Sequence, residues 1–174
     1  MDEVELKILD VNRNELVKKL IVLGAKKIFE GSVHTKLFDF RDRSLTKAKA
    51  TIRIRKIGGK TVVTFKGYVP NKFAKHSDEI EIEITDYLKM ESIFRSLGLR
   101  QILEAKKKRV SYMLDEARLD FDNYLGKYDC IPEYVEIEAR STAKLLETVK
   151  KMGFGTKDCS KSTFSDLKKR YCKQ

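Results

Sequence analysis

The stretch Glu3-Val4-Glu5-Leu6-Lys7-Ile8 alternates charged and aliphatic side chains at the two-residue period of a β-strand. Because successive side chains of a strand point to opposite faces, this stretch has one ionic face and one apolar face. Five further stretches repeat the alternation, at residues 52–55, 64–66, 79–84, 119–122 and 135–138. The pattern predicts an antiparallel sheet in which one face is ionic and the other is apolar.

The charges on these stretches are sorted by sign. Residues 79–84 carry only glutamates on the charged face, an earlier stretch carries Arg53 and Arg55, and Lys107 and Arg109 precede a further apolar run. A solvent-exposed sheet usually mixes its charges, because like charges on one face repel. The sorting favours an enclosed ionic face that binds a ligand, since carboxylates suit a divalent metal and Arg and Lys suit phosphate oxygens. A plain solvent-exposed ionic face is the alternative.

Size and charge narrow the class of protein. A chain of 174 residues with 41% hydrophobic content is predicted to form one globular domain spanning residues 1–174. Its 37 Lys and Arg against 26 Asp and Glu give a net charge of +11, which favours an anionic partner such as a nucleotide or polyphosphate. Many lysines fall on predicted helices, where solubility explains them equally well, and no RNA-binding aromatic motif is present, so nucleic acid is a minor hypothesis. The sequence lacks the glycine motifs of P-loop and Rossmann nucleotide sites.

Cysteine usage and hydropathy predict the compartment. Cys130, Cys159 and Cys172 lack metal-ligand spacing, and their odd number suggests reduced thiols in a reducing compartment rather than a disulfide scaffold. The chain has neither the apolar run of a signal peptide nor the apolar stretch of about 20 residues that would span a membrane. We therefore expect a cytoplasmic protein with no membrane partner.

Three amphipathic helices are predicted, each after an acidic strand and each ending at a glycine. Their apolar residues recur at helical spacing, so we expect the helices to cover the apolar face of the sheet from outside. The predicted helices span about residues 13–23, 86–97 and 142–152, with capping residues Asn12, Thr85 and Ser141 and terminal glycines Gly24, Gly98 and Gly153.

The connections carry their own turn signals. The Gly58-Gly59 pair predicts the turn of a hairpin between the arginine strand and the next strand. Residues 68–77 contain a proline and an asparagine and are predicted to form a loop or lid. We also expect a polar connection at residues 44–49, an irregular insertion at residues 127–132 and a short helix at residues 162–167.

The order of these elements resembles a known family. A Glu-x-Glu-x-Lys strand at residues 3–7 is followed by Arg-x-Arg (53–55), Thr-Phe-Lys-Gly (64–67), an acidic strand, Lys-Lys-Arg (107–109), an aspartate strand and a second Glu-x-Glu (136–138). This ordered set is similar to the CYTH domain of the triphosphate tunnel metalloenzymes, which include class IV adenylyl cyclases and thiamine triphosphatases. The resemblance runs from residue 3 to about residue 167.

The resemblance implies an α+β fold, namely a closed eight-stranded antiparallel β-barrel that forms a tunnel with flanking helices. A triphosphate would bind inside together with Mg²⁺ or Mn²⁺, and the number of ions stays open. The implied phosphate-binding residues are Lys7, Arg53, Arg55, Lys66, Lys107 and Arg109, with Lys7, Arg55 and Lys66 as the catalytic residues. The implied metal ligands are Glu3, Glu5, Glu81, Asp122, Glu136 and Glu138. Asp120 shares a face with Asp122, and Glu79 and Glu83 share a face with Glu81, so these three residues remain alternatives.

The reaction is less sharply specified than the site. Hydrolysis of a triphosphate and cyclisation of ATP need the same cations and metal, and they differ in how the nucleotide lies in the tunnel. We expect a metal-dependent triphosphatase acting on tripolyphosphate, thiamine triphosphate or a nucleoside triphosphate, because no residue pattern marks an adenine pocket. A class IV adenylyl cyclase is the alternative, favoured by the single-domain format and by residues 162–167, which resemble the tail of the cyclase-like branch. A non-catalytic triphosphate sensor is a third hypothesis, and a homodimer is also open because family members often dimerise.

Overall fold

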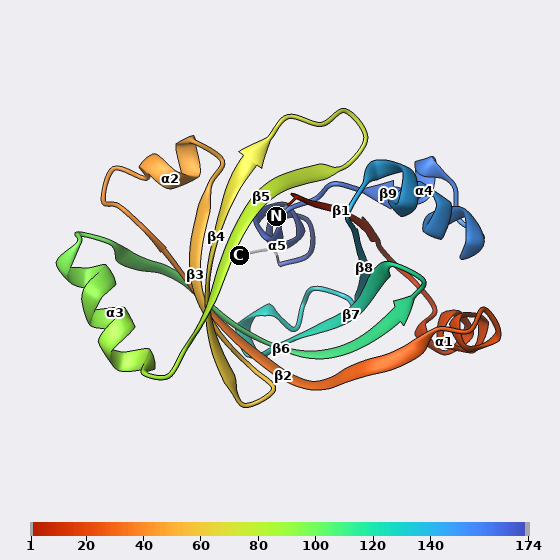
Figure 1. Cartoon of the computed structure of the whole chain (residues 1–174), viewed down its shortest axis with the longest axis horizontal. Helices are drawn as coiled ribbons and strands as arrows, with labels where there is room; N and C mark the ends of the chain where they lie inside the picture. The colour runs from red at the N-terminus through yellow and green to blue at the C-terminus, as the bar shows by residue number, and fades with distance from the viewer. Residues whose placement is uncertain (1, 173–174) are drawn as a thin grey trace.

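The computed structural model describes residues 2–172, in which nine strands are interspersed with five α-helices (Figure 1). The strands are β1 (Asp2–Ile8), β2 (Lys26–Asp39), β3 (Thr51–Ile57), β4 (Lys60–Val69), β5 (Lys75–Ile84), β6 (Arg100–Leu114), β7 (Ala117–Leu125), β8 (Tyr134–Ala139) and β9 (Cys159–Ser160). The helices are α1 (Arg13–Val22), α2 (Ser44–Lys47), α3 (Tyr87–Ser96), α4 (Thr142–Lys151) and α5 (Phe164–Tyr171), with 3₁₀ turns at Gly126–Tyr128 and Thr156–Asp158.

Eight of the strands close into an antiparallel barrel. They follow the order β5-β4-β3-β2-β6-β7-β8-β1, and β1 closes the ring by pairing with β5, with Glu5 opposite Lys75. The short β9 pairs with Lys7 and Ile8, along the part of the β1 edge beyond the β5 pairing. The predicted closed eight-stranded barrel with flanking helices is thereby confirmed.

The larger apolar core lies outside the barrel rather than inside it. The alternation of β1 places Val4, Leu6 and Ile8 on the outer face, where they join a buried cluster with Leu20 of α1 and Leu145 of α4. Figure 1 shows α1 and α4 together on this side of the barrel. The expectation that helices cover the apolar outer face is confirmed here, and it follows that the charged residues of β1 face the interior.

A second core lies on the opposite flank, under α3. Phe38 of β2 and Ile54 of β3 pack there against Phe94 of α3, and the rings of Phe38 and Phe94 meet edge to face with centroids 5.1 Å apart. The cover is incomplete, because Ile80 and Ile82 on the outer face of β5 are 64% and 59% exposed. The outer face of β5 is therefore the least covered part of the barrel wall among these strands.

The predicted helix ends are confirmed with one change. Asn12 and Ser141 cap α1 and α4 by accepting hydrogen bonds from backbone N–H groups three residues ahead. The middle helix begins later than expected, because the carboxylate of Asp86, not the Thr85 side chain, accepts from the Lys89 N–H. The following glycines take positive φ angles of 86°, 88° and 82°, which explains why each helix stops there. Within residues 2–172, none of the helices has the length and apolar character needed to cross a membrane.

The connections are shorter than the turn signals suggested. The hairpin at Gly58-Gly59 is confirmed. The loop expected at residues 68–77 is limited to residues 70–74, because Tyr68 pairs with Ser77 and Val69 pairs with His76. The polar connection at residues 44–49 contains the short helix α2, and a 3₁₀ turn begins the irregular segment after β7. The last helix runs over Phe164–Tyr171, later than the predicted 162–167, because Thr163 and Asp166 form a capping box at its start.

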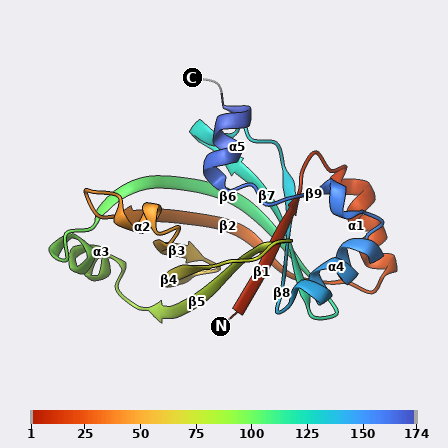
Figure 2. The same ribbon diagram turned by 90° about the horizontal axis from the view of Figure 1, so that it is seen from above.

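The helix α5 covers one end of the barrel. Figure 2 shows α5 at the end towards which β1 runs, while the N-terminal end of β1 lies at the other. Leu167 of α5 is fully buried in a cluster with Tyr124 and Tyr134, and the ring of Phe164 lies 5.2 Å from that of Tyr124. Apolar packing therefore fills this end of the barrel.

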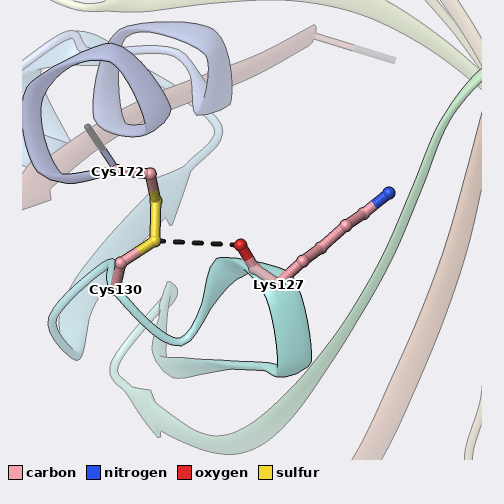
Figure 3. Close-up of a disulfide and its surroundings, with 3 residues drawn as sticks. All are labelled: Lys127, Cys130 and Cys172. Atoms are coloured by element: carbon pink, nitrogen blue, oxygen red, sulfur yellow. Dashed lines mark hydrogen bonds between the residues drawn. A yellow bond between two sulfur atoms is a disulfide. The ribbon is translucent and has the colours of Figure 1, made fainter. Parts of the chain in front are cut away.

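A disulfide joins α5 to the segment after β7, which corrects the expectation of three reduced cysteines. Cys130 and Cys172 are bonded with their Cα atoms 5.4 Å apart, while Cys159 is a free thiol (Figure 3). The Sγ of Cys130 also lies 3.9 Å from the Lys127 carbonyl oxygen. The prediction was wrong because cysteine spacing carries no information about a contact that the fold makes between residues 42 positions apart. The cysteine count therefore supports no particular compartment.

Candidate active site

The ionic faces of the strands meet inside the barrel. Ion pairs link β1 to β4 and β8, β3 and β4 to β5, and β6 to β7, so the predicted residues of seven strands surround one interior. Half of these side chains are buried although they are charged. The predicted site residues on this inner wall are Glu3, Glu5, Lys7, Arg53, Arg55, Lys66, Glu81, Lys107, Arg109, Asp122, Glu136 and Glu138.

Three carboxylates converge on the β1–β8 side of the interior. Glu5 and Glu138 lie directly opposite each other in the two strands, and Glu3 joins them, so that one oxygen of each lies within 4.8 Å of the others. Convergent carboxylate oxygens are the ligands that a hard divalent cation prefers. Within the described residues, this cluster of Glu3, Glu5 and Glu138 is the arrangement that fits a metal ion, and we refer to it as the acidic cluster.

The three carboxylates of the acidic cluster differ in how far nearby cations compensate their negative charge. Burial, a hydrogen bond with Glu79 and the charge of Glu138 raise the pKa of Glu3 to about 9. Burial also raises the pKa of Glu138, and Arg118 offsets this only in part. Glu5 differs, because Lys7, Lys75 and Lys66 outweigh its burial and lower its pKa to about 2. A divalent cation would supply the positive charge that Glu3 and Glu138 lack, and would displace a proton in doing so.

A second pair of carboxylates, on β7, has a different environment. The side chains of Asp120 and Asp122 are fully buried, and Arg109 donates two hydrogen bonds of 2.7 Å to Asp122, from Nε and Nη2. Arg109 also forms an ion pair with Asp120, and Lys107 forms one with Asp122. Although burial raises it, the pKa of Asp122 is lowered by Lys107 and Arg109. Both oxygens of Asp122 are paired with cations, while Asp120 pairs through Oδ2 and leaves its buried Oδ1 without a hydrogen bond. The two aspartates hold Lys107 and Arg109 in place.

The remaining cations lie on β3 and β4, facing β5. Arg53 lies 3.8 Å from Glu79, Arg55 lies 3.2 Å from Glu81, and Lys66 reaches both Glu3 at 2.6 Å and Glu79 at 2.9 Å. Burial, followed by the charges of Arg53 and Arg109, lowers the pKa of Arg55 to about 10. Several cations are thus held close enough to repel one another, which is the environment that a polyanion would relieve.

Lys7 completes the set from β1. Its Nζ lies 3.4 Å from both Glu5 and Glu136, and these carboxylates raise its pKa although burial opposes the charge. The pKa of Glu136 is correspondingly held well below its ordinary value, against the effect of burial, by Lys7 and Lys107. Lys7 therefore lies between the acidic cluster and the cations of β6.

The structure separates some predicted metal ligands from the acidic cluster. Glu81 is 46% exposed in its side chain and accepts hydrogen bonds from Arg55 and from the Thr64 hydroxyl. Glu79, the alternative on the same strand, is closer to the cluster, because Lys66 bridges it to Glu3 and it shares a hydrogen bond with Glu3. Glu136 and Asp122 are instead paired with Lys7 and with Arg109 and Lys107.

Two cations of the interior were missed by the sequence analysis. Lys75 donates to Glu5 at 2.7 Å, and Arg118 pairs with Glu138 and Asp120. Both continue the alternation of a strand already identified, since Arg118 precedes Asp120 by two positions. Extending the β7 stretch by one period would have found Arg118, whereas Lys75 lies two periods before Glu79, among residues that were predicted to form a loop.

Comparisons with known proteins agree with this fold and interior. The CYTH domain family model matches residues 1–171. A protein of Methanocaldococcus jannaschii named "Putative adenylate cyclase" is 32% identical over 126 residues, which cover 72% of this chain and 72% of that protein.

Solved structures resemble the chain over nearly its whole length. A conserved hypothetical protein of Pyrococcus furiosus superposes with a TM-score of 0.77 at 24% identity, covering 95% of this chain and 99% of the other. A protein of Vibrio parahaemolyticus described as a putative adenylate cyclase gives a TM-score of 0.79 at 18% identity, covering 95% and 96%. At these identities the likeness establishes the shared fold.

Proposed function

The chain belongs to the CYTH domain family, and we propose that it is a metal-dependent triphosphatase that binds a triphosphate inside its barrel. One observation carries the proposal: Lys7, Arg55, Lys66 and Arg109, from four different strands, face one interior that also holds the acidic cluster. A triphosphate is a ligand that needs both kinds of group at once.

The cations would act by binding and neutralising phosphate oxygens. Arg109 and Lys7 are already desolvated and held in place by carboxylates, so a triphosphate would bind cations that need no further desolvation. The fixed fork of Arg109 suits two phosphate oxygens in the same way that it suits Asp122. Hydrolysis gains most from such charges where they meet the negative charge that develops on the phosphate being transferred.

The residues of the acidic cluster fit a divalent ion. Glu3, Glu5 and Glu138 would hold Mg²⁺ or Mn²⁺, which when bound supplies positive charge to the phosphates and orients them. Lys66 lies 2.6 Å from Glu3 and 3.7 Å from Glu5, so a phosphate bound by Lys66 would lie next to this ion. This proximity of Lys66 to the acidic cluster supports a substrate that binds next to the metal.

Adenylyl cyclase activity is the second candidate function. The name of the Methanocaldococcus jannaschii relative favours it, and the same cations would serve attack at a different phosphorus atom. The two candidates share the binding site and differ in their products, so product analysis separates them.

The test is an assay of the purified protein with tripolyphosphate, thiamine triphosphate and ATP, each with Mg²⁺, with Mn²⁺ and with a chelator. We expect chelator-sensitive release of phosphate. Cyclic AMP and pyrophosphate from ATP would instead support the cyclase, and tight triphosphate binding without products would support a sensor.

Matched arginine variants locate the reaction. We expect Arg55→Ala to lower kcat/KM by at least about a hundredfold, because it removes a charge that faces the transferred phosphate. Arg13→Ala is the control, since Arg13 lies on α1 and pairs with Glu133 outside the barrel. Equal activity of the two variants would contradict the placement of the substrate in the tunnel.

A further inference from the structure

One part of the barrel's inner wall is apolar, and the triphosphatase proposal makes no use of it. On β3, the inner face carries Arg53 and Arg55 and then Ile57 near the β3–β4 hairpin, and Val62 of β4 lies on the same face opposite Arg55. Val33 of β2 lies opposite Ile57 in the ladder and belongs to the same face. Tripolyphosphate has no apolar group to place against such a wall.

A β-bulge adds an aromatic ring to this apolar wall. Lys27 lies opposite Tyr112, whose ring belongs to the outer core, so an unbroken ladder would turn Phe29 outward as well. The register shifts between Lys27 and Phe29, and Phe29 instead lies opposite Ser111, on the same face as Arg109. Bulges that re-aim a side chain are frequent beside active sites.

Two glycines make room for the ring of Phe29. A Cβ added to Gly31 would lie 3.0 Å from the Cζ of Phe29, and one added to Gly58 would lie 3.3 Å from its Cε2. Gly31 is also the residue opposite Arg109 in the ladder, so the half-buried ring lies beside a phosphate-binding cation. The absence of both Cβ atoms keeps the ring against the wall and leaves it partly accessible.

The opposite end of the barrel offers no such room. There α5 packs onto Tyr124, Tyr128 and Tyr134, with Phe164 only 4.9 Å from Tyr128 between ring centroids. The Nζ atoms of Lys7 and Lys107 lie 5.9 and 5.6 Å from the ring centroids of Tyr134 and Tyr124, so these aromatic rings pack against the cations. Within the described residues, an organic group attached to a triphosphate would meet packed aromatic rings at the α5 end, whereas towards Phe29 it would meet a partly accessible ring.

We propose that Phe29 is a specificity-determining residue that stacks against the base of a nucleoside triphosphate whose phosphates lie on Arg55 and Arg109. This inference rests on the proposed function and narrows its substrate class from triphosphates in general to nucleoside triphosphates. Stacking on an aromatic ring accepts any base, because every base has a π-face. The residue thus selects a flat ring attached to the phosphates rather than one particular nucleobase.

The test compares ATP with tripolyphosphate in the full chain, by measuring consumption of each. We expect Phe29→Leu, which keeps an apolar side chain but removes the ring, to raise KM for ATP by on the order of tenfold. The KM for tripolyphosphate should not change, and Phe29→Tyr should retain the value for ATP because it retains the ring. Phe73→Leu is the matched control, since Phe73 is 58% exposed in the loop between β4 and β5.

The outcomes are separable from those of the triphosphatase proposal. Equal loss with both substrates, or no loss with ATP, would overturn the role of Phe29. Wild-type activity on tripolyphosphate but not on ATP would overturn it as well, while leaving the triphosphatase intact. If the wild-type protein consumed neither substrate, the proposed function and this inference would fall together.

Discussion

Two groups of carboxylates line the interior of the barrel and differ in how far nearby cations compensate their negative charge. In the acidic cluster, the pKa of Glu3 is raised to about 9 because its burial and its neighbours leave its charge uncompensated. On β7, Asp122 is fully buried and yet has a lowered pKa, because Arg109 and Lys107 compensate its charge. Glu3 therefore has a deficit of positive charge around it, whereas Asp122 has none.

An acidic residue on the ionic face is therefore not automatically a metal ligand. The family resemblance implied that Glu3 and Asp122 belong to one set of metal ligands. In the structure, the two carboxylates have different partners: Glu3 pairs with Lys66 of β4, and Asp122 pairs with Lys107 and Arg109 of β6. We therefore expect Glu3 to serve the metal and Asp122 to serve the phosphate-binding cations.

The largest expected effect is on stability. Asp122→Asn removes the partner of two buried cations and should lower the free energy of unfolding by about 3–5 kcal/mol. Glu3→Gln should cost less than about 1 kcal/mol, because the carboxyl that it replaces is protonated at neutral pH. Urea unfolding of both variants at pH 7 with a chelator present measures both losses. Equal losses of stability would contradict the difference between Glu3 and Asp122.

Metal affinity should show the reverse order. Glu3→Gln should weaken Mn²⁺ binding by on the order of a hundredfold, since it removes a ligand from the acidic cluster. Asp122→Asn should leave the affinity near that of the wild type, provided that circular dichroism shows it folded at the temperature used. Calorimetric titration with Mn²⁺ measures both, and a larger loss in Asp122→Asn would place the ion on β7 instead.

The smallest expected effect is the change in metal affinity over a single pH unit. Because the folded pKa of Glu3 is about 9, an ion that binds at pH 7 must displace its proton, so the affinity should rise by up to about tenfold per pH unit until pH 9. For the metal-free protein the sign is opposite: the stability due to protonated Glu3 is complete below its ordinary pKa of 4.5 and is lost as the pH rises towards 9. Metal titrations in buffers of different ionisation enthalpy would reveal the released proton, and affinity that does not change with pH would contradict the raised pKa.

Much of the barrel could be predicted because its signal is local. Each alternating stretch encodes its own strand and both of its faces, so Glu3 and Val4 can be assigned to opposite sides without knowledge of the fold. The longest strands, β2 and β6, are marked less clearly because charged and apolar residues mix on their faces. Closure of the barrel came from the family resemblance and not from the alternation.

The features that escaped prediction depend on contacts between distant residues. The register shift before Phe29 is a property of the pairing of β2 with β6, and the Cys130–Cys172 disulfide depends on where α5 docks. The different ion pairs of Glu3 and Asp122 depend likewise on cations from other strands. None of these contacts leaves a periodic trace in the sequence.

The position of β1 also has a consequence for how the chain reaches its native state. This strand precedes β8 and β9 by more than 120 residues, and Lys7 pairs with Glu136 and Ser160, which are synthesised much later. Contacts between residues so far apart in sequence slow folding, because the loop entropy is lost before the contacts form. We therefore expect Val4, Leu6 and Ile8 to stay exposed on the ribosome until the last quarter of the chain emerges, which makes the nascent chain prone to aggregation during that interval.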